Sequence, residues 1–194
     1  MKSTDVRIED VRFSFQDFLY RTPIKFGGVA LDRVTLLDAD VRVRTIDGRK
    51  GIGHGSMPLG NVWAWPTRAM AYADTLRAMK EMAGHVCYIM GGCKEAGHPV
   101  ELTTLLEPEY WKRSANMGTP EPMPKLAAAV AASPFDAALH DAFGKALGLN
   151  CYKTYSREFL PHDLGRYLGE EFAGLHLGDF IAAEPVPSLP LYHL

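Results

Sequence analysis

Few side chains in this sequence have the type and spacing that chemistry requires, and the clearest group lies near residue 140. Asp136 and His140 are four residues apart, and Asp141 follows directly. Residues four apart lie on one face of a helix, so Asp136 and His140 could hold a metal ion or position a base. No third ligand is close to them in the sequence, and we favour an ion pair beneath a helical layer.

Two further candidates lie in the first third of the chain. His54 stands in a Gly-rich stretch, where it could contact an anionic ligand or act as an acid or base. Lys25 lies between two apolar residues in a segment with Pro and Gly, and could place an ammonium at the mouth of an apolar pocket that binds a carboxylate. An ordinary surface histidine and a solvent-exposed lysine are the competing interpretations.

Standard catalytic and nucleotide-binding motifs are missing from the sequence. There is no phosphate-binding loop that ends in Gly-Lys-Ser/Thr, no zinc-protease helix motif and no serine nucleophile elbow. Gly51, Gly53 and Gly55 resemble a phosphate-binding run only loosely, and we expect a turn that needs a permissive backbone. Trp63 and Trp65 follow them and could line a substrate pocket or pack in the core.

The elements that must position these residues begin as strands. Val11, Phe13 and Phe15 alternate with polar residues, and residues 39–43 repeat that pattern, which is typical of half-buried strands. The turn signal Asp47-Gly48 comes next, so residues 51–55 could return as a third strand. The Pro- and Gly-containing segment 21–28 is predicted to be a loop that packs against another part of the protein.

Helical periodicity replaces the alternation from Pro66 onward. Apolar residues recur every three or four positions as far as Gly91-Gly92, and Pro99 and Pro108 could each be the first residue of a short helix.

The strongest helix is predicted over residues 125–147. Gly148 is a suitable C-terminal cap, and Pro134 is expected to kink or split the helix. Residues 164–168 could form a further turn of helix, and residues 189–194 could begin a strand. Strands followed by helices predict an α+β fold, with a three-stranded antiparallel meander packed on a helical layer and an extended C-terminal connector.

Composition sets outer limits on function. The 194 residues are 47% hydrophobic and 23% charged, with a formal net charge of −2, as in ordinary globular proteins of one domain, or one domain with a fragment of a second. Near-neutral charge gives no reason to expect nucleic acid, and no apolar run reaches the roughly 20 residues that span a bilayer.

Three cysteines without CxxC spacing and a polar N-terminus predict a cytoplasmic protein. A (β/α)₈ barrel alone needs about 200 to 250 residues, so the chain is too short to hold one beside these elements.

The order of five segments resembles that in a known family. These are the strand over residues 6–18, the segment 21–29, the strand that runs to residues 45–48, the segment 51–66 and the helix segment 133–145. In this order they resemble the N-terminal capping domain of the enolase superfamily, in its mandelate racemase/muconate lactonizing enzyme branch. The resemblance implies a capping domain over residues 1–150 and a connector over residues 151–194 that leads towards a missing barrel.

In that family the cap closes over the open end of a (β/α)₈ barrel, and two cap loops contact the substrate. Here these loops correspond to about residues 21–29 and 53–61. The resemblance implies five substrate-binding residues: Lys25, Phe26, Gly28, His54 and Met57. The family's barrel carries a Lys or His base that removes a proton α to a carboxylate, and Mg²⁺ stabilises the charge that develops.

The sequence departs from the family where the chemistry would begin. It ends at about the first barrel strand, so no catalytic residue and no metal ligand can be assigned. We therefore expect a truncated capping domain that is inactive alone. The full enzyme would be a Mg²⁺-dependent isomerase or dehydratase of a carboxylate substrate, such as an acid sugar, and it could be a homo-oligomer.

Two alternatives remain open. The chain could be a complete small-molecule binding or interaction module that uses the same loops as a pocket. A large uncovered apolar patch on the loop face favours the cap, and a closed face favours the module. A small metal hydrolase built on His54, Asp136 and His140 is a weaker alternative, because it requires these side chains to converge.

Overall fold

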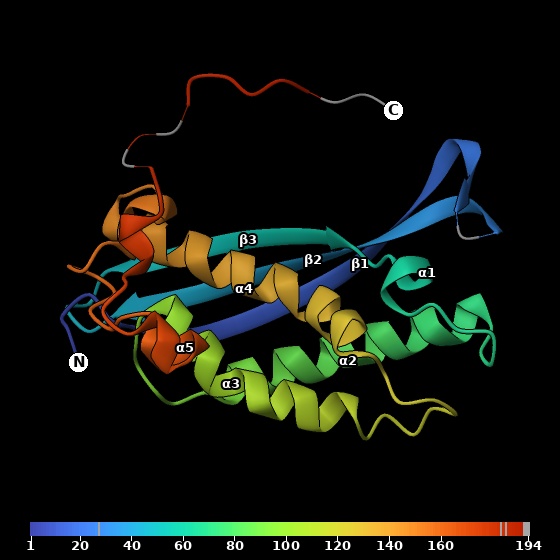
Figure 1. The fold of residues 1–194 in the computed structure, drawn as a ribbon, viewed down its shortest axis with the longest axis horizontal. Helices are drawn as coiled ribbons and strands as arrows, with labels where there is room; N and C mark the ends of the chain where they lie inside the picture. Colours follow the sequence, from blue (N-terminus) through green and yellow to red (C-terminus); the bar gives the residue numbers. More distant parts are fainter. Residues whose placement is uncertain (27, 183, 185, 192–194) are drawn as a thin grey trace.

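Three long antiparallel strands form the sheet that the alternating pattern predicts (Figure 1). The computed structural model describes residues 1–26, 28–182, 184 and 186–191. The strands are β1 (Val6–Phe26), β2 (Val29–Thr45) and β3 (Lys50–Pro58), in the order β1-β2-β3. Helices pack against the sheet, so the predicted α+β fold is confirmed.

Four helices follow the sheet in the chain. They are α1 (Asn61–Ala64), α2 (Tyr72–Gly92), α3 (Pro99–Ser114) and α4 (Lys125–Leu147). Helix α2 starts later than Pro66 and ends at the predicted glycine pair. Pro99 begins α3 as predicted, but the expectation that Pro108 starts another helix is wrong, because Pro108 lies inside α3.

Helix α4 runs unbroken through Pro134, and the predicted split does not occur. Proline has no N–H to donate to the carbonyl of Val130 four residues earlier. The Ser133 hydroxyl donates to that carbonyl instead, at 3.1 Å, which supplies a substitute hydrogen bond. Gly148 ends the helix with a φ of 69°, as its predicted role as a cap requires.

The core lies between the sheet and the helical layer. Its fully buried apolar side chains come from all three parts of the fold: Val6, Leu37 and Val41 from the sheet, Met79 and Met82 from α2, and Phe135, Leu139 and Phe143 from α4. This apolar layer fixes which face of the sheet is covered, and the opposite face of β2 and β3 carries mainly polar residues.

Gly51, Gly53 and Gly55 lie in β3 against α4, so the prediction of a turn there is wrong. A Cβ added at Gly53 would lie 2.0 Å from the carbonyl oxygen of Ala138 and 2.2 Å from the amide nitrogen of Ala142. The other two glycines meet α4 in the same way. The missing side chains allow the helix backbone to approach the strand, which is a packing requirement rather than a conformational one.

The two segments predicted as cap loops are largely strand. Segment 21–28 was expected to be a loop, but β1 continues to Phe26 and pairs with β2 beyond an irregularity between Leu19 and Ile24. The described ends of β1 and β2 extend beyond the helical layer (Figure 1). Residues 53–58 likewise belong to β3.

The rest of the chain forms short helical turns. These are the 3₁₀ helices η1 (Cys151–Tyr155), η2 (Glu170–Phe172) and η3 (Leu177–Asp179), and the helix α5 (Gly165–Leu168) at the predicted position. Residues 189–191 form no strand, and the remainder of the strand expected over 189–194 lies outside the described residues. No described helix combines the length and apolar character needed to cross a bilayer.

Candidate functional site

Three cavities lie where the hairpin end of β1 and β2 faces the segment after β3, and two of them concern the predicted residues. The smaller, of about 150 Å³, has Ile24 and Phe26 in one wall and Leu59 and Trp63 in another. The larger, of about 350 Å³, lies between Val29 and residues 61–75. The two segments expected to contact substrate therefore do meet here.

Phe26 is the predicted site residue that lines the smaller cavity, and its side chain is half exposed. Ile24 lies on the same face of β1, since alternate residues of a strand share a face. Lys25 lies between them and so points to the opposite face of the hairpin. Gly28 is in the turn with a φ of 83°, a conformation that favours glycine.

His54 and Met57 lie elsewhere on the sheet. His54 pairs with Asp40 and Met57 pairs with Leu37, whereas Lys25 pairs with Ala30. Along a strand the seven steps from Ala30 to Leu37 correspond to about 24 Å. The five predicted residues therefore do not line one cavity.

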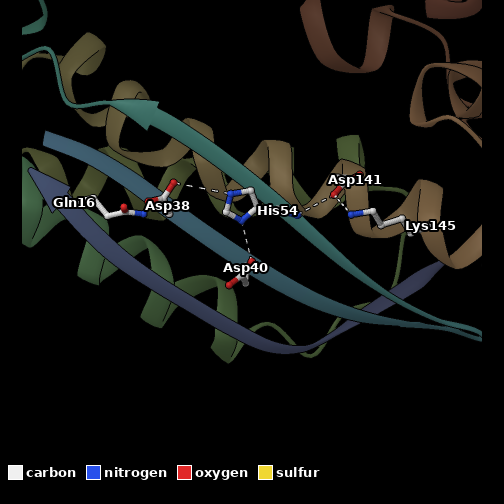
Figure 2. A network of polar contacts seen from close by, with 6 residues as sticks. All are labelled: Gln16, Asp38, Asp40, His54, Asp141 and Lys145. Atoms are coloured by element: carbon white, nitrogen blue, oxygen red, sulfur yellow. Dashed lines mark hydrogen bonds and ion pairs between the residues drawn. The ribbon is translucent and has the colours of Figure 1, made fainter. Parts of the chain in front are cut away.

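The His54 ring lies on the open face of the sheet between two carboxylates (Figure 2). Its Nδ1 is 3.0 Å from Oδ1 of Asp40, and its Nε2 is 3.9 Å from Oδ1 of Asp38. The Gln16 amide donates to the other oxygen of Asp38 at 2.7 Å. This arrangement suits a histidine held by neighbouring acidic residues, and it places the ring away from α4.

The backbone of His54 is tied to α4 on the other side. Its N–H donates to Oδ2 of Asp141 at 2.9 Å, and Lys145 donates to the same oxygen at 2.7 Å (Figure 2). Burial would raise the pKa of Asp141, but the hydrogen bonds from Lys145 and from His54 outweigh it and lower the pKa. Asp141 therefore links β3 to α4 as a carboxylate.

Asp136 and His140 lie one turn apart on α4 and approach each other, as their spacing predicts. His140 Nε2 lies 3.7 Å from Oδ1 of Asp136, and its Nδ1 is 3.1 Å from the hydroxyl of Tyr155. Burial lowers the pKa of His140, so the ring is neutral near pH 7. The His54 ring faces the other side of the sheet, which excludes the three-residue metal hydrolase site. Among the described residues, no three His, Cys, Asp or Glu side chains are grouped closely enough to hold a metal ion.

Two residues of structural or binding interest were missed in the sequence. Tyr72 lines all three hairpin cavities, although its only sequence signal was its place at the start of a helix. His98 is fully buried, with Nε2 3.1 Å from the carbonyl oxygen of Thr154 and Nδ1 accepting from the N–H of Val100 at 3.2 Å. Burial lowers the pKa of His98 to about 3. Its place directly before Pro99, at a helix start, was the available signal.

Comparisons with known proteins identify the fold. No protein-family model and no curated protein matches the sequence. Among solved structures, L-talarate/galactarate dehydratase from Salmonella typhimurium LT2 is 22% identical, with a TM-score of 0.50 over 79% of this chain and 34% of that chain.

Two further solved structures have lower scores. An enolase from Bradyrhizobium, complexed with magnesium and mandelic acid, is 18% identical over 84% of this chain and 36% of its own, with a TM-score of 0.47. A mandelate racemase/muconate lactonizing enzyme-like protein from Rubrobacter xylanophilus is 22% identical over 77% of this chain and 33% of its own, with a TM-score of 0.40. The chain thus spans about a third of the length of the structures it matches. The fold is therefore that of about a third of L-talarate/galactarate dehydratase.

Proposed function

We propose that this chain is a capping domain that covers the open end of a (β/α)₈ barrel and supplies residues that contact the substrate. The enzyme so formed would be a Mg²⁺-dependent isomerase or dehydratase of a carboxylate substrate, with a sugar acid as the leading candidate. The fold shared with a third of L-talarate/galactarate dehydratase is the observation that carries the proposal. Structures of that dehydratase hold Mg with L-glucarate and Mg with L-lyxarohydroxamate, which supports the substrate class.

Exposed apolar side chains on the hairpin support a cap over a self-contained binding module. Leu19 is 75% exposed, and Phe18, Ile24, Phe26 and Val29 are each 42–48% exposed. Exposed apolar side chains on both faces of this part of β1 and β2 favour contact with a second body. A complete module would be expected to close this face over its own pocket.

The five residues expected from the resemblance remain part of the proposal, with different weights. Phe26 is favoured because it shares a cavity with Trp63 and Tyr72, which offer aromatic faces to a ligand. Gly28 has no side chain and would allow a ligand or the barrel to come close to the hairpin turn. Lys25, His54 and Met57 would need a ligand or barrel surface that extends around the hairpin and along β3.

The described residues do not fit a magnesium site. Mg²⁺ is bound in proteins through oxygen ligands in octahedral geometry, mainly carboxylates together with water. No group of three acidic or other ligating side chains occurs among the described residues. We therefore assign both the metal and the catalytic base to the barrel, and no catalytic step to this chain.

Proton exchange tests the proposal. The purified chain is incubated in D₂O with Mg²⁺ and galactarate, glucarate or mandelate, and loss of the α-proton signal is followed by ¹H NMR. We expect no exchange by the chain alone. Magnesium-dependent exchange that the chain catalyses by itself would contradict the proposal.

The second part of the test combines the chain with a barrel, where activity is expected. The coding region around this chain is sequenced for a barrel with acidic metal ligands, whether in the same reading frame or in a neighbouring one, and the two parts are assayed together. Phe26→Ala is expected to lower kcat/KM at least tenfold, whereas Tyr88→Phe, at an exposed position on α2, should leave it unchanged. Equal activity of both variants would contradict the role of the hairpin.

A further inference from the structure

A cavity of about 210 Å³ between α3 and α4 is separate from the hairpin cavities and shares no lining residue with them. Its walls are one stripe from each helix. From α4 come Ala129, Ala132, Ser133 and Asp136, and from α3 come Thr103, Glu107, Tyr110 and Trp111, with Met90 of α2 as the remaining wall. The small residues of α4 face the large aromatic residues of α3, which leaves the space unfilled.

Tyr110 gives this cavity a polar group in need of a partner. The side chain is 4% exposed, and its buried hydroxyl has no hydrogen-bond partner among the described residues. Burial raises the pKa of Tyr110, and the negative charge of Asp136 raises it further, so the hydroxyl stays neutral. A buried hydroxyl without a partner is costly, and a ligand that bonds to it would remove that cost.

The charged residues around the cavity favour a positively charged ligand. Asp136 and Glu107 carry carboxylates, and none of the described lining residues is Lys, Arg or His. Thr103 donates to Oδ1 of Asp136 at 2.7 Å, which fixes the carboxylate. His140 lies 3.7 Å from the same oxygen, and burial lowers its pKa, so the ring supplies no positive charge to offset that of Asp136.

Trp111 contributes an aromatic wall, and Lys125 Nζ lies 5.6 Å from the centre of its ring. We propose that the cavity between α3 and α4 binds a small primary amine with an apolar body. Its ammonium would donate to Asp136 and to the Tyr110 oxygen, and its apolar body would lie against Met90, Trp111 and Ala132.

Three matched probes test the proposal on the whole chain: cyclohexylmethylamine, its neutral counterpart cyclohexylmethanol and the anion cyclohexanecarboxylate. Binding is followed by chemical-shift changes in ¹H–¹⁵N spectra. We expect the amine to bind with a Kd in the low millimolar range or tighter, and the other two at least tenfold more weakly. Shift changes should centre on Met90, Ala129 and Ala132.

Variants identify the groups responsible. Tyr110→Phe and Asp136→Asn are each expected to weaken amine binding at least fivefold, because one removes the hydroxyl and the other the charge. Ala132→Leu should abolish binding by filling the space. Glu109→Gln is the matched control, since Glu109 is an exposed carboxylate on α3 that does not line the cavity, and it should leave the Kd unchanged.

Several results would overturn the proposal. These are no amine binding up to 20 mM, equal binding of the carboxylate, or unchanged affinity in both Tyr110→Phe and Asp136→Asn. Those two variants preserve side-chain size, so they test the site even if Ala132→Leu fails to fold. A fall in Tm for Tyr110→Phe without any probe binding would mean that the hydroxyl serves only water in the cavity, which also contradicts an amine site.

Discussion

At the scale of single residues, the glycines of β3 matter because they have no side chain. Helix α4 lies so close to Gly51, Gly53 and Gly55 that a Cβ at any of them would overlap helix backbone atoms. Backbone cannot move aside as a flexible side chain can, so the contact admits no larger residue without separation of helix and strand. The alternating glycines thus set the distance between the two layers.

Replacement of the central glycine tests this. We expect Gly53→Ala to lower the free energy of unfolding by about 3 kcal/mol or more, because the added carbon meets backbone at 2.0 Å. Urea unfolding followed by circular dichroism measures the loss. Gly91→Ala is the control, since nothing lies within 4 Å of the added carbon, and alanine at this helical position should stabilise by about 0.5 kcal/mol. Equal effects of the two substitutions would contradict the packing role.

The buried His98 side chain makes the stability of the fold depend on pH. Its pKa is about 3 in the folded protein and about 6.5 when unfolded, because burial disfavours the charged ring. The unfolded chain therefore binds more protons between these values, so the stability that His98 contributes is complete above pH 6.5 and falls as the pH is lowered towards 3. We expect a loss of about 1.4 kcal/mol between pH 7.5 and 5.5 from this residue. Urea midpoints at the two pH values measure it.

The control for this prediction keeps the helix start intact. His98→Asn retains an acceptor for the N–H of Val100 but no longer titrates, so the chain should be less stable overall and less sensitive to pH. An undiminished pH dependence in His98→Asn would contradict the assignment.

At the scale of elements, the hairpin contrasts with the rest of the sheet. The rest of the two strands contributes fully buried residues, such as Val6 in β1 and Leu37 in β2. In contrast, no described residue from 20 to 32 is buried. This end of the ladder is held by backbone hydrogen bonds and half-exposed apolar side chains. Such a segment is suited to contact with something outside the chain, since the fold itself needs little from it.

Removal of the hairpin end tests this division. Residues 20–32 are replaced by Asn-Gly, which joins the pair Leu19 and Arg33 through a two-residue turn. We expect the free energy of unfolding to change by no more than about 1 kcal/mol, because no buried side chain is lost. Urea unfolding of the shortened chain measures the change, and loss of cooperative unfolding would show that the hairpin is part of the core structure.

At the scale of the whole molecule, the charged residues are dispersed over the surface. Ion pairs such as Arg44 with Glu9 and Arg49 with Asp47 are exposed and local. Among the described residues, the acidic side chains do not collect into a metal-binding group.

Magnesium should therefore leave the isolated chain unaffected. We expect Tm to change by less than about 1 °C between excess EDTA and millimolar MgCl₂, because a ligand stabilises a fold only to the extent that it binds the folded state. Differential scanning fluorimetry measures the shift, with NaCl of equal ionic strength as the control. A magnesium-specific rise of several degrees would reveal a site within this chain.

Much of the local structure was predictable from the sequence. Alternation in residues 11–15 and 39–43 predicted strands, Gly148 predicted the end of α4, and Pro99 predicted the start of α3, because each signal acts through its own backbone neighbourhood. The ordered segments also predicted the fold to which the chain is similar.

Only the tertiary structure decided the rest. The glycines of β3 looked like a turn because their requirement comes from α4, which lies some 85 residues later in the chain. Segment 21–28 looked like a loop because its strand is set by pairing with β2 rather than by its own residues. Lys25, Phe26, His54 and Met57 were grouped by resemblance, but strand alternation and register place them on different faces and at different points of the sheet. The sequence alone determined the local elements and the family they resemble, whereas distances between remote segments, and so the shape of any site, depend on packing that no local pattern encodes.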